Sequence, residues 1–162
     1  MIVITINGIE YAKCFQKVEW SGGINGSSRV LQVQYEYNKI KPKLGEKVEF
    51  KLDDTKILFL GKIFELTSNA NKTVNTFKCY DASIYLNKNK FIKNYFNRVP
   101  SQITKEICGE LGLNVGELPQ DKVKCTFPAI GRSGYEIILA AYTIQHNKDK
   151  VIYSLVCNGE KI

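Results

Sequence analysis

The stretch from Leu44 to Tyr80 contains three strand patterns in series and constrains the fold more than any other part of the chain. Its middle pattern, Ile57 to Leu66, is apolar on both faces, which is typical of a strand near the middle of a closed or packed sheet. Gly61 lies at the centre of that pattern, and a glycine inside a strand usually marks a bulge or a sharp bend. Closure of a small sheet removes its exposed edges. The stretch therefore predicts a small antiparallel β-barrel, with Gly61 as its structural bend.

The chain before this stretch alternates between apolar and polar residues, the pattern of half-buried strands. Residues 30–37 are the clearest case, because Leu31, Val33, Tyr35 and Tyr37 share one face. Further strands are expected at residues 2–6, 12–20, 46–52, 57–66 and 76–80, which makes six short strands before residue 82. The dipeptide Asn7-Gly8 is typical of a tight hairpin turn.

The periodicity changes after Asp81, which is expected to cap a short helical turn over residues 82–86. The polar segment 87–90 then predicts a domain boundary. We expect an antiparallel β-barrel domain at residues 1–90 and a small α/β domain at residues 91–162, so that the fold class is α+β. The last residues contain a turn with no further element after it, so the α/β domain is expected to be incomplete.

The expected α/β domain reads as an extended piece followed by helix, strand, helix and strand. Ser101 is the expected N-cap of the first helix, and Gly112 is its expected stop. The second helix should begin at Ser133, since Ser133 and Glu136 have the spacing of a capping box. The two strands are expected at residues 123–127 and 151–157.

Composition excludes several classes of protein. A chain of 162 residues with 44% hydrophobic residues can bury an ordinary core. The first residues lack the basic region of a signal peptide, and no apolar run reaches the roughly 18 residues of a membrane span. We therefore expect a soluble, intracellular product with no membrane partner.

Cysteine and histidine do not indicate a metal or a nucleophilic site. The five cysteines are far apart, without a CxxC pair, and each lies in an apolar run, so we expect reduced and buried thiols. His146 is the single histidine and is expected at the exposed end of the second helix. The glycine-rich segment 22–28 lacks the lysine of a phosphate-binding loop and leads into a strand. No catalytic residue, cofactor or metal is predicted.

Paired carboxylates leave a glycosidase open as an alternative. The candidates are Asp53 with Asp54, in an expected turn, and Glu106 with Glu110, four residues apart on the exposed face of the first helix. Neighbouring aspartates before a strand are usually turn formers, so this interpretation is the weaker one.

Nucleic-acid binding by a small barrel is a second alternative, since the net charge is +7. Tyr35 and Tyr37, near Lys39, Lys41 and Lys43, are the nearest match to a stacking platform. Those tyrosines share the apolar face of their strand, however, and only three of the 23 basic residues are arginine: Arg29, Arg98 and Arg132. A lysine-coated surface without direct sequence readout is therefore the preferred interpretation.

Several short motifs, in order, resemble the XkdQ-like tail and baseplate hub proteins of contractile phages and PBSX-type defective prophages. They are Trp20-Ser21-Gly22, Leu44-Gly45-Glu46, Phe59-Leu60-Gly61-Lys62-Ile63-Phe64, Tyr80-Asp81-Ala82-Ser83-Ile84-Tyr85-Leu86, Val99-Pro100-Ser101-Gln102-Ile103, Gly112-Leu113-Asn114-Val115-Gly116 and Ser133-Gly134-Tyr135-Glu136-Ile137-Ile138-Leu139-Ala140-Ala141-Tyr142. The resemblance covers nearly the whole chain.

This resemblance implies a non-enzymatic virion structural protein that joins the tail tube to the baseplate and its spike. Expected partners are the tail tube, the spike and a peptidoglycan-binding baseplate protein, with a homotrimer in the assembled particle. Assembly is expected in the bacterial cytoplasm, and the product in a virion or tail-like particle. Since proteins of this kind are about twice as long, this chain would be the N-terminal half or an expressed fragment. Two alternatives remain, a tail-associated peptidoglycan hydrolase and a single-stranded nucleic-acid-binding barrel.

Overall fold

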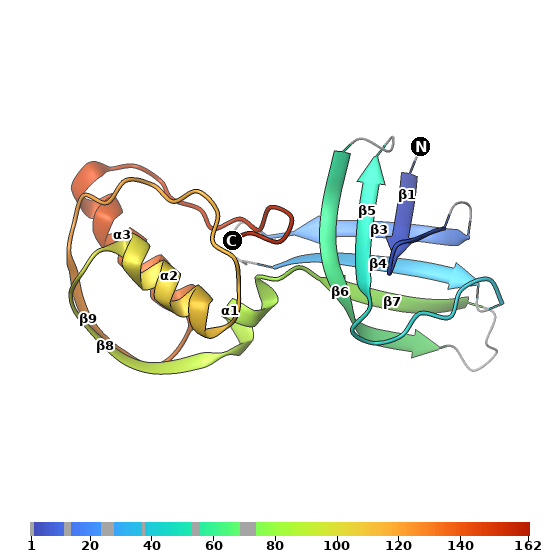
Figure 1. Cartoon of the computed structure of the whole chain (residues 1–162), viewed down its shortest axis with the longest axis horizontal. Coiled ribbons are helices and arrows are strands. Elements are labelled where there is room, and N and C mark those ends of the chain that lie inside the picture. The colour runs from blue at the N-terminus through green and yellow to red at the C-terminus, as the bar shows by residue number, and fades with distance from the viewer. Residues whose placement is uncertain (1, 12–13, 24–27, 37, 53–55, 69–73) are drawn as a thin grey trace. The chain divides into compact units, whose positions relative to one another are not determined.

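The computed structural model describes residues 2–11, 14–23, 28–36, 38–52, 56–68 and 74–162. The chain divides into two compact units, Met1–Ala82 and Ser83–Ile162, and each is described by itself (Figure 1). The domain boundary expected after residue 90 stays a prediction.

The first unit is built on one antiparallel sheet of seven strands in the order β2-β1-β5-β6-β7-β4-β3. The strands are β1 (Ile2–Ile6), β2 (Ile9–Tyr11), β3 (Phe15–Gly22), β4 (Arg29–Glu36), β5 (Lys47–Leu52), β6 (Lys56–Ser68) and β7 (Val74–Tyr80). The predicted Asn7-Gly8 turn is confirmed, since both residues have positive φ and join β1 to β2. Of the strand expected over residues 12–20, residues 15–20 lie in β3, and residues 12–13 lie outside the described part; β2 precedes this segment.

The long strand β6 lets this sheet curl. It pairs with β5 through residues 56–62 and with β7 through residues 62–68, so its two halves belong to different parts of the sheet. In Figure 1, β1 and β5 run across the direction of β3, β4 and β7. The described edge strands, β2 and β3, do not pair with each other. The predicted antiparallel barrel is thus confirmed as a sheet curled into a half-barrel.

Gly61 lies in β6 just before the pairing changes from one neighbour to the other, opposite Val48 of β5. A Cβ atom on Gly61 would lie 2.3 Å from the carbonyl oxygen of Tyr80 and 2.6 Å from the ring of Phe59. Backbone and an aromatic ring therefore occupy the space that a side chain would need.

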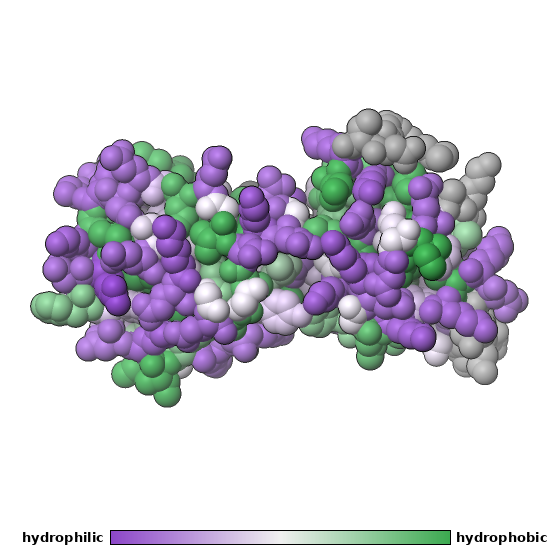
Figure 2. Space-filling model, viewed as in Figure 1, coloured by the Kyte–Doolittle hydropathy of each residue, from purple (hydrophilic) through white to green (hydrophobic). Residues whose placement is uncertain are grey.

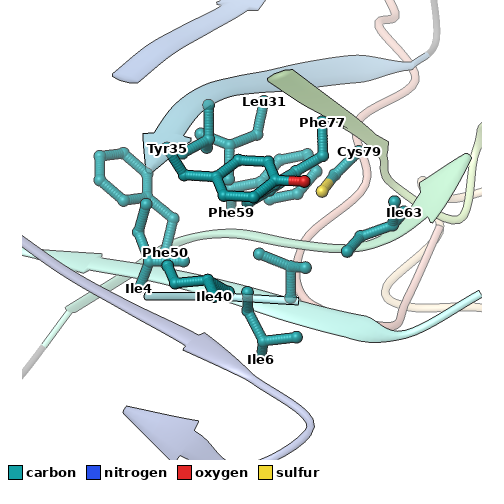
Figure 3. Close-up of a cluster of buried hydrophobic side chains, with 12 residues drawn as sticks. Ile4, Ile6, Leu31, Tyr35, Ile40, Phe50, Phe59, Ile63, Phe77 and Cys79 are labelled. Atoms are coloured by element: carbon teal, nitrogen blue, oxygen red, sulfur yellow. The ribbon is translucent and has the colours of Figure 1, made fainter. Parts of the chain in front are cut away.

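The core of the half-barrel lies inside the curled sheet (Figure 3). Leu31, Val33 and Tyr35 all point inward from β4, as the alternation predicted. Phe77 is fully buried, with its ring 5.6 Å from that of Tyr35. Each such aromatic or aliphatic side chain contributes about 1.5–3 kcal/mol when fully buried. The core residues are Ile4, Ile6, Leu31, Val33, Tyr35, Ile40, Val48, Phe50, Phe59, Ile63, Phe77 and Cys79.

The second unit combines a two-stranded antiparallel sheet with three helices. Its elements are α1 (Ile84–Lys88), β8 (Lys90–Arg98), α2 (Pro100–Glu110), β9 (Cys125–Ser133) and α3 (Gly134–Asp149). Helix α3 packs against α1, α2 and β9 and so organises a separate core. The most buried apolar residues of that core are Leu86, Ile103, Ile107, Cys108, Cys125, Ala129, Ile137 and Ala141.

The start of α3 confirms the predicted capping box. The Ser133 hydroxyl accepts a hydrogen bond from the backbone N–H of Glu136 (3.2 Å), and the Glu136 carboxylate accepts one from the backbone N–H of Ser133 (2.7 Å). The prediction that Ser101 caps α2 is wrong. Val99 is the N-cap residue and Pro100 opens the helix, because proline has no N–H to satisfy and its φ is already helical. The Ser101 hydroxyl instead donates to Asp121, 20 residues later in the chain.

Two further local predictions are wrong. Asp81 does not cap α1; its carboxylate accepts a hydrogen bond from the backbone N–H of Arg29 (3.1 Å), and α1 begins at Ile84 without a side-chain cap. Residues 151–157 form no strand; within them the backbone of Val151 and the hydroxyl of Tyr153 bond to side chains of α3. The strand expected over residues 123–127 is present but lies later, as β9.

Candidate assembly surface

Of the four carboxylate candidates, the structure describes Glu106 and Glu110, which form an ion-paired cluster. Glu106 and Glu110 lie one turn apart on α2, and both bind the ammonium group of Lys93 on β8, Glu106 at 2.7 Å. These hydrogen bonds hold the pKa of Lys93 well above its usual range, so the lysine stays charged. The two carboxylates held by one ammonium group form an ion-paired cluster that joins α2 to β8. Asp53 and Asp54 lie outside the described residues.

His146 and the cysteines are in structural positions. His146 lies in the last turn of α3, and its Nδ1 is 2.8 Å from the carbonyl oxygen of Val151. None of the five cysteines is in a disulfide: Cys14 is half-buried, and Cys79, Cys108, Cys125 and Cys157 are buried. Burial raises the pKa of the Cys108 thiol to about 11, so that it is not a thiolate at neutral pH.

Of the two tyrosines considered as a stacking platform for nucleic acid, the structure describes Tyr35, which is buried. Tyr35 is 6% exposed and contributes to the core, while Tyr37 lies outside the described residues. In the described part of the chain no group of three His, Cys, Asp or Glu residues is placed to hold a metal ion. Of the glycine-rich segment 22–28, residues 24–27 are also outside the described part.

The described helices include none that is both long and apolar enough to cross a membrane.

The open side of the half-barrel is the candidate assembly surface of the first unit. Strand β3 is eight residues long and pairs with β4, and within the described chain no strand covers its other edge. Trp20 of β3 lies opposite the buried Leu31 on the inward face, yet it is 42% exposed because the sheet stops there. Its ring meets Phe50 at 6.4 Å, and the guanidinium of Arg29 lies 5.7 Å above it. Tryptophan and arginine are enriched among the residues that dominate protein interfaces.

A pocket of about 210 Å³ lies in the second unit, between α2, α3 and the segment that follows α3. It is lined mainly by apolar and aromatic side chains, including Ile138, Leu139 and Tyr142 from α3 and Val156 from the last segment. The Tyr142 hydroxyl is buried there without a hydrogen-bond partner. Its ionisable lining side chains are Glu117 and the tyrosines Tyr135, Tyr142 and Tyr153.

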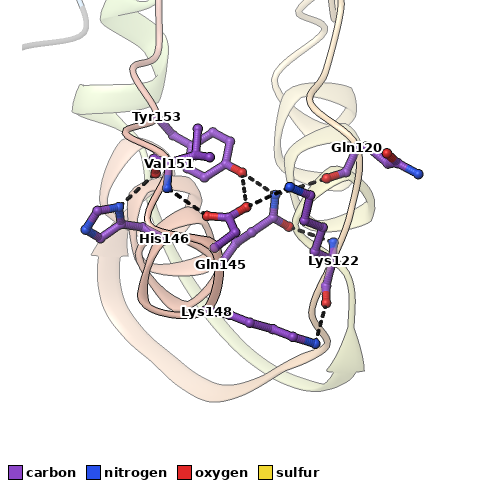
Figure 4. A network of polar contacts seen from close by, with 8 residues as sticks. Gln120, Lys122, Gln145, His146, Lys148, Val151 and Tyr153 are labelled. Carbon is purple, nitrogen blue, oxygen red and sulfur yellow. Dashed lines mark hydrogen bonds and ion pairs between the residues drawn. The ribbon is translucent and has the colours of Figure 1, made fainter.

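A polar network fixes the last segment against α3 (Figure 4). The Tyr153 hydroxyl donates to the Asp149 carboxylate (2.6 Å) and accepts a hydrogen bond from the side-chain amide of Gln145 (2.8 Å). Gln145 also donates to the carbonyl of Gln120, and its oxygen accepts from the backbone N–H of Lys122. The hydrogen bond from the Tyr153 hydroxyl is the largest cause of a lowered pKa of Asp149, followed by the hydrogen bond from the backbone N–H of Val151 and the nearby Lys122 ammonium group.

Sequence reasoning did not single out Trp20 with Arg29, the pocket or the Gln145 network. All three depend on contacts between different elements, which the pattern of a single segment does not show. A local signal existed for Gln145, which falls on the same helical stripe as Ile138, Ala141 and Tyr142, and an amide on such a stripe implies a hydrogen-bond partner.

The family model for YQBQ-like proteins matches residues 18–162 of this chain. The chain belongs to the YQBQ-like family. No curated protein matches it. The family match covers most of the half-barrel and the entire second unit, so both units of this YQBQ-like chain are family features.

Three solved structures share the fold of this YQBQ-like chain. A 43 kDa tail protein of prophage MuSo2 from Shewanella oneidensis matches with a TM-score of 0.73 and 15% identity, over 89% of this chain and 48% of that one. A tail protein from Neisseria meningitidis MC58 matches with a TM-score of 0.66 and 12% identity, over 85% of this chain and 43% of that one.

The third structure is the c3393 protein of E. coli, a component of the type VI secretion system with structural similarity to the phage T4 tail proteins gp27 and gp5. It matches with a TM-score of 0.57 and 13% identity, over 85% of this chain and 42% of that one. The YQBQ-like chain thus spans less than half the length of these solved proteins, and the shared feature is the fold of phage and prophage tail proteins.

Proposed function

We propose that this YQBQ-like chain is a structural subunit of a phage tail or a phage-tail-like particle, and that it acts as a baseplate hub protein joining the tail tube to the baseplate and spike. The observation that carries the proposal is the tail-protein fold, which extends over both units and coincides with the family match. A joining role requires surfaces for neighbours rather than chemistry, and the uncovered edge strand β3 with Trp20 is such a surface.

The proposed neighbours are the tail tube, the spike and a peptidoglycan-binding baseplate protein, with three copies of this chain in a closed ring. An edge strand can bind another chain by continuing its sheet, and in a ring each copy offers one such edge to the next. The subunit would assemble in the bacterial cytoplasm and end in the finished particle. We propose no enzymatic activity, because the ion-paired Glu106 and Glu110 are the only predicted catalytic candidates among the described residues.

Co-assembly tests this proposal. The full-length protein is co-expressed with the tail-tube and baseplate proteins from the same genome, and complexes are isolated by affinity purification and sized. We expect co-purification with at least one of them, and a weaker complex for Trp20→Ser, which removes the exposed ring at the open edge. Gln16→Ala is the matched control, since Gln16 is an exposed residue of the same strand. A full-length protein that stays monomeric and binds none of these proteins contradicts the proposal.

The hydrolase alternative has a separate test. Purified peptidoglycan is incubated with the full-length protein and soluble fragments are measured. We expect no release. Release that is abolished by Glu106→Gln or Glu110→Gln would replace the structural proposal with the enzymatic one.

A further inference from the structure

The β8–β9 ribbon of the second unit has one face on the helices and one in solvent. Tyr95 and Ala129 are buried on the inner face. On the outer face Ile92 and Ile130 are directly paired across the strands, and Phe96 lies two positions beyond Asn94 on β8. These three large side chains are 83%, 73% and 78% exposed, respectively.

Figure 2 shows hydrophobic side chains projecting from a mostly hydrophilic surface along the edge of the unit that β8 and β9 follow. Single exposed apolar residues are ordinary, but an aligned set on one flat ribbon marks an interaction surface. We define the outer-ribbon face as Ile92, Phe96 and Ile130 with the exposed Pro128.

The charges that the two strands themselves carry have one sign, and the nearby carboxylate of Glu136 at the start of α3 interacts with Lys90 and Arg132. Strands β8 and β9 contain Lys90, Lys93, Arg98 and Arg132 and no acidic residue. Lys93 is bound to Glu106 and Glu110, whereas Arg98 and Arg132 are exposed and form no salt bridge with any described residue. They are two of the only three arginines in a chain with 23 basic residues.

The register places the two arginines at opposite ends of the ribbon. Arg132 lies opposite Phe91 and Arg98 opposite Cys125, so the paired segment between them is roughly 20 Å long at the usual rise of a strand. Arginine binds carboxylates through two parallel hydrogen bonds, which gives both affinity and direction.

We propose that the outer-ribbon face binds an extended segment of another protein that has apolar side chains in its middle and carboxylates at both ends. The apolar side chains would cover Ile92, Phe96 and Ile130, and the carboxylates would pair with Arg98 and Arg132. The inference deepens the proposed function, on which it rests, because it states the chemistry of one neighbouring subunit.

A second copy of the same face is a poor occupant. Two outer-ribbon faces brought together would place cationic rims against each other, because the two strands carry no acidic residue, and like charges across an interface are strongly unfavourable. An acidic segment removes this repulsion and also uses the net charge of +7 to accelerate encounter.

A peptide titration tests the proposal with the intact chain. The probe is an eight-residue peptide with glutamates at both ends and leucines alternating with threonines between them, followed by NMR shifts of the β8 and β9 amides. We expect it to bind at least tenfold more tightly than the same peptide with lysines in place of the glutamates, and tenfold more tightly than one with serines in place of the leucines. Raising the salt concentration should reduce the preference for the glutamate-ended over the lysine-ended peptide, but not the preference for leucines over serines.

Two double variants locate the interaction. The double variant Ile92→Ser with Ile130→Ser should weaken binding of the acidic peptide at least tenfold. Because both residues are exposed, the variant should keep its fold, which a circular dichroism spectrum checks. Arg98→Glu with Arg132→Glu should reverse the preference toward the lysine-ended peptide. Equal binding of the acidic and basic peptides, or loss of neither preference in the variants, refutes the proposal.

Analytical sedimentation of the chain without peptide tests whether a second copy of the chain occupies the outer-ribbon face. A dimer that Ile92→Ser with Ile130→Ser converts to monomer would assign the face to a second copy and overturn the acidic-segment proposal. Because the peptide experiment needs no tail protein, its failure leaves the co-assembly result unaffected, and failed co-assembly leaves the peptide result standing.

Discussion

Gly61 is a position where a side chain would meet rigid groups. Its Cβ would lie 2.3 Å from the Tyr80 carbonyl oxygen, and a backbone oxygen in a paired strand cannot move away as a flexible side chain can. The glycine was predicted to be the structural bend of a barrel, and that role stays a prediction, although the surrounding contacts explain why no larger residue fits.

Gly61→Ala should therefore lower the free energy of unfolding by about 3 kcal/mol, at the upper end for overpacking, and Gly61→Val by more. Chemical denaturation followed by tryptophan fluorescence measures this, since Trp20 lies in the same sheet. Gly109→Ala is the control: its Cβ would meet nothing within 4 Å, and alanine in helix α2 should stabilise by up to about 1 kcal/mol. A Gly61→Ala variant as stable as the parent would contradict the steric argument.

Asp149 should make the stability of the second unit depend on pH in the acidic range. Tyr153, the backbone of Val151 and Lys122 hold its pKa below the ordinary value of an aspartate. A carboxylate with a lowered folded pKa contributes its full stabilisation above the unfolded pKa, near 3.9, and loses it as the pH falls through the lower folded value.

Asp149→Asn should consequently reduce stability at pH 6 and flatten the decline between about pH 4 and pH 2. Denaturation midpoints of parent and variant at several pH values in this range measure the effect. The same decline in both proteins would show that Asp149 has no part in it.

At the scale of elements, short sequence patterns correctly predicted a feature that is stabilised by hydrogen bonds between residues close together in the chain. The Ser133 capping box was correct because both partners lie within one helical turn. Ser101 has the same residue type before an apolar stripe, but its hydroxyl and backbone N–H bind Asp121, a residue that no local pattern connects to it.

Ser133→Ala should destabilise the second unit by about 1 kcal/mol, the usual cost of losing an N-cap. Thr143→Ala is the matched control, because Thr143 is exposed on the same helix and its hydroxyl bonds only the preceding Leu139 carbonyl. Thermal or denaturant unfolding of both variants gives the comparison, and equal losses would mean that α3 does not depend on its cap.

The segment after α3 shows where periodicity fails. Residues 151–157 alternate as a strand would, yet no strand is available beside them. Their alternation reflects a different contact, with Tyr153 turned toward Gln145 and Asp149, and Val156 lining the pocket. Alternation with a period of two shows which side chains of a segment are covered. It does not show whether a neighbouring strand or another element covers them.

At the scale of the whole molecule, alternation predicted a curled sheet but not how far it closes. The inward faces of β4 and β5 were readable from Leu31, Val33, Val48 and Phe50. Whether β2 and β3 meet depends on the number and tilt of all the strands, which no single segment encodes. The open edge, and with it Trp20 as a surface residue, was invisible to sequence reasoning for this reason.

Two separate cores imply two separable folding units. Phe77 is fully buried in the first unit, and Phe77→Ala should cost about 3–5 kcal/mol there. Hydrogen exchange should show faster exchange throughout β4, β6 and β7, while α2, β9 and α3 keep their protection. Simultaneous loss of protection in both units would mean that they unfold as one.

Strand β6 also determines how the half-barrel would carry a mechanical load. In the described sheet β6 is the only strand that links β5 to β7. A force applied to one edge strand of the sheet is therefore transmitted to the other edge strand through the backbone hydrogen bonds of β6. Strands sheared along their length must break many hydrogen bonds together, whereas an edge strand peeled sideways loses them one at a time. Strand β2 pairs through only three residues, so it should detach first under tension, while β6 holds the two halves of the sheet together.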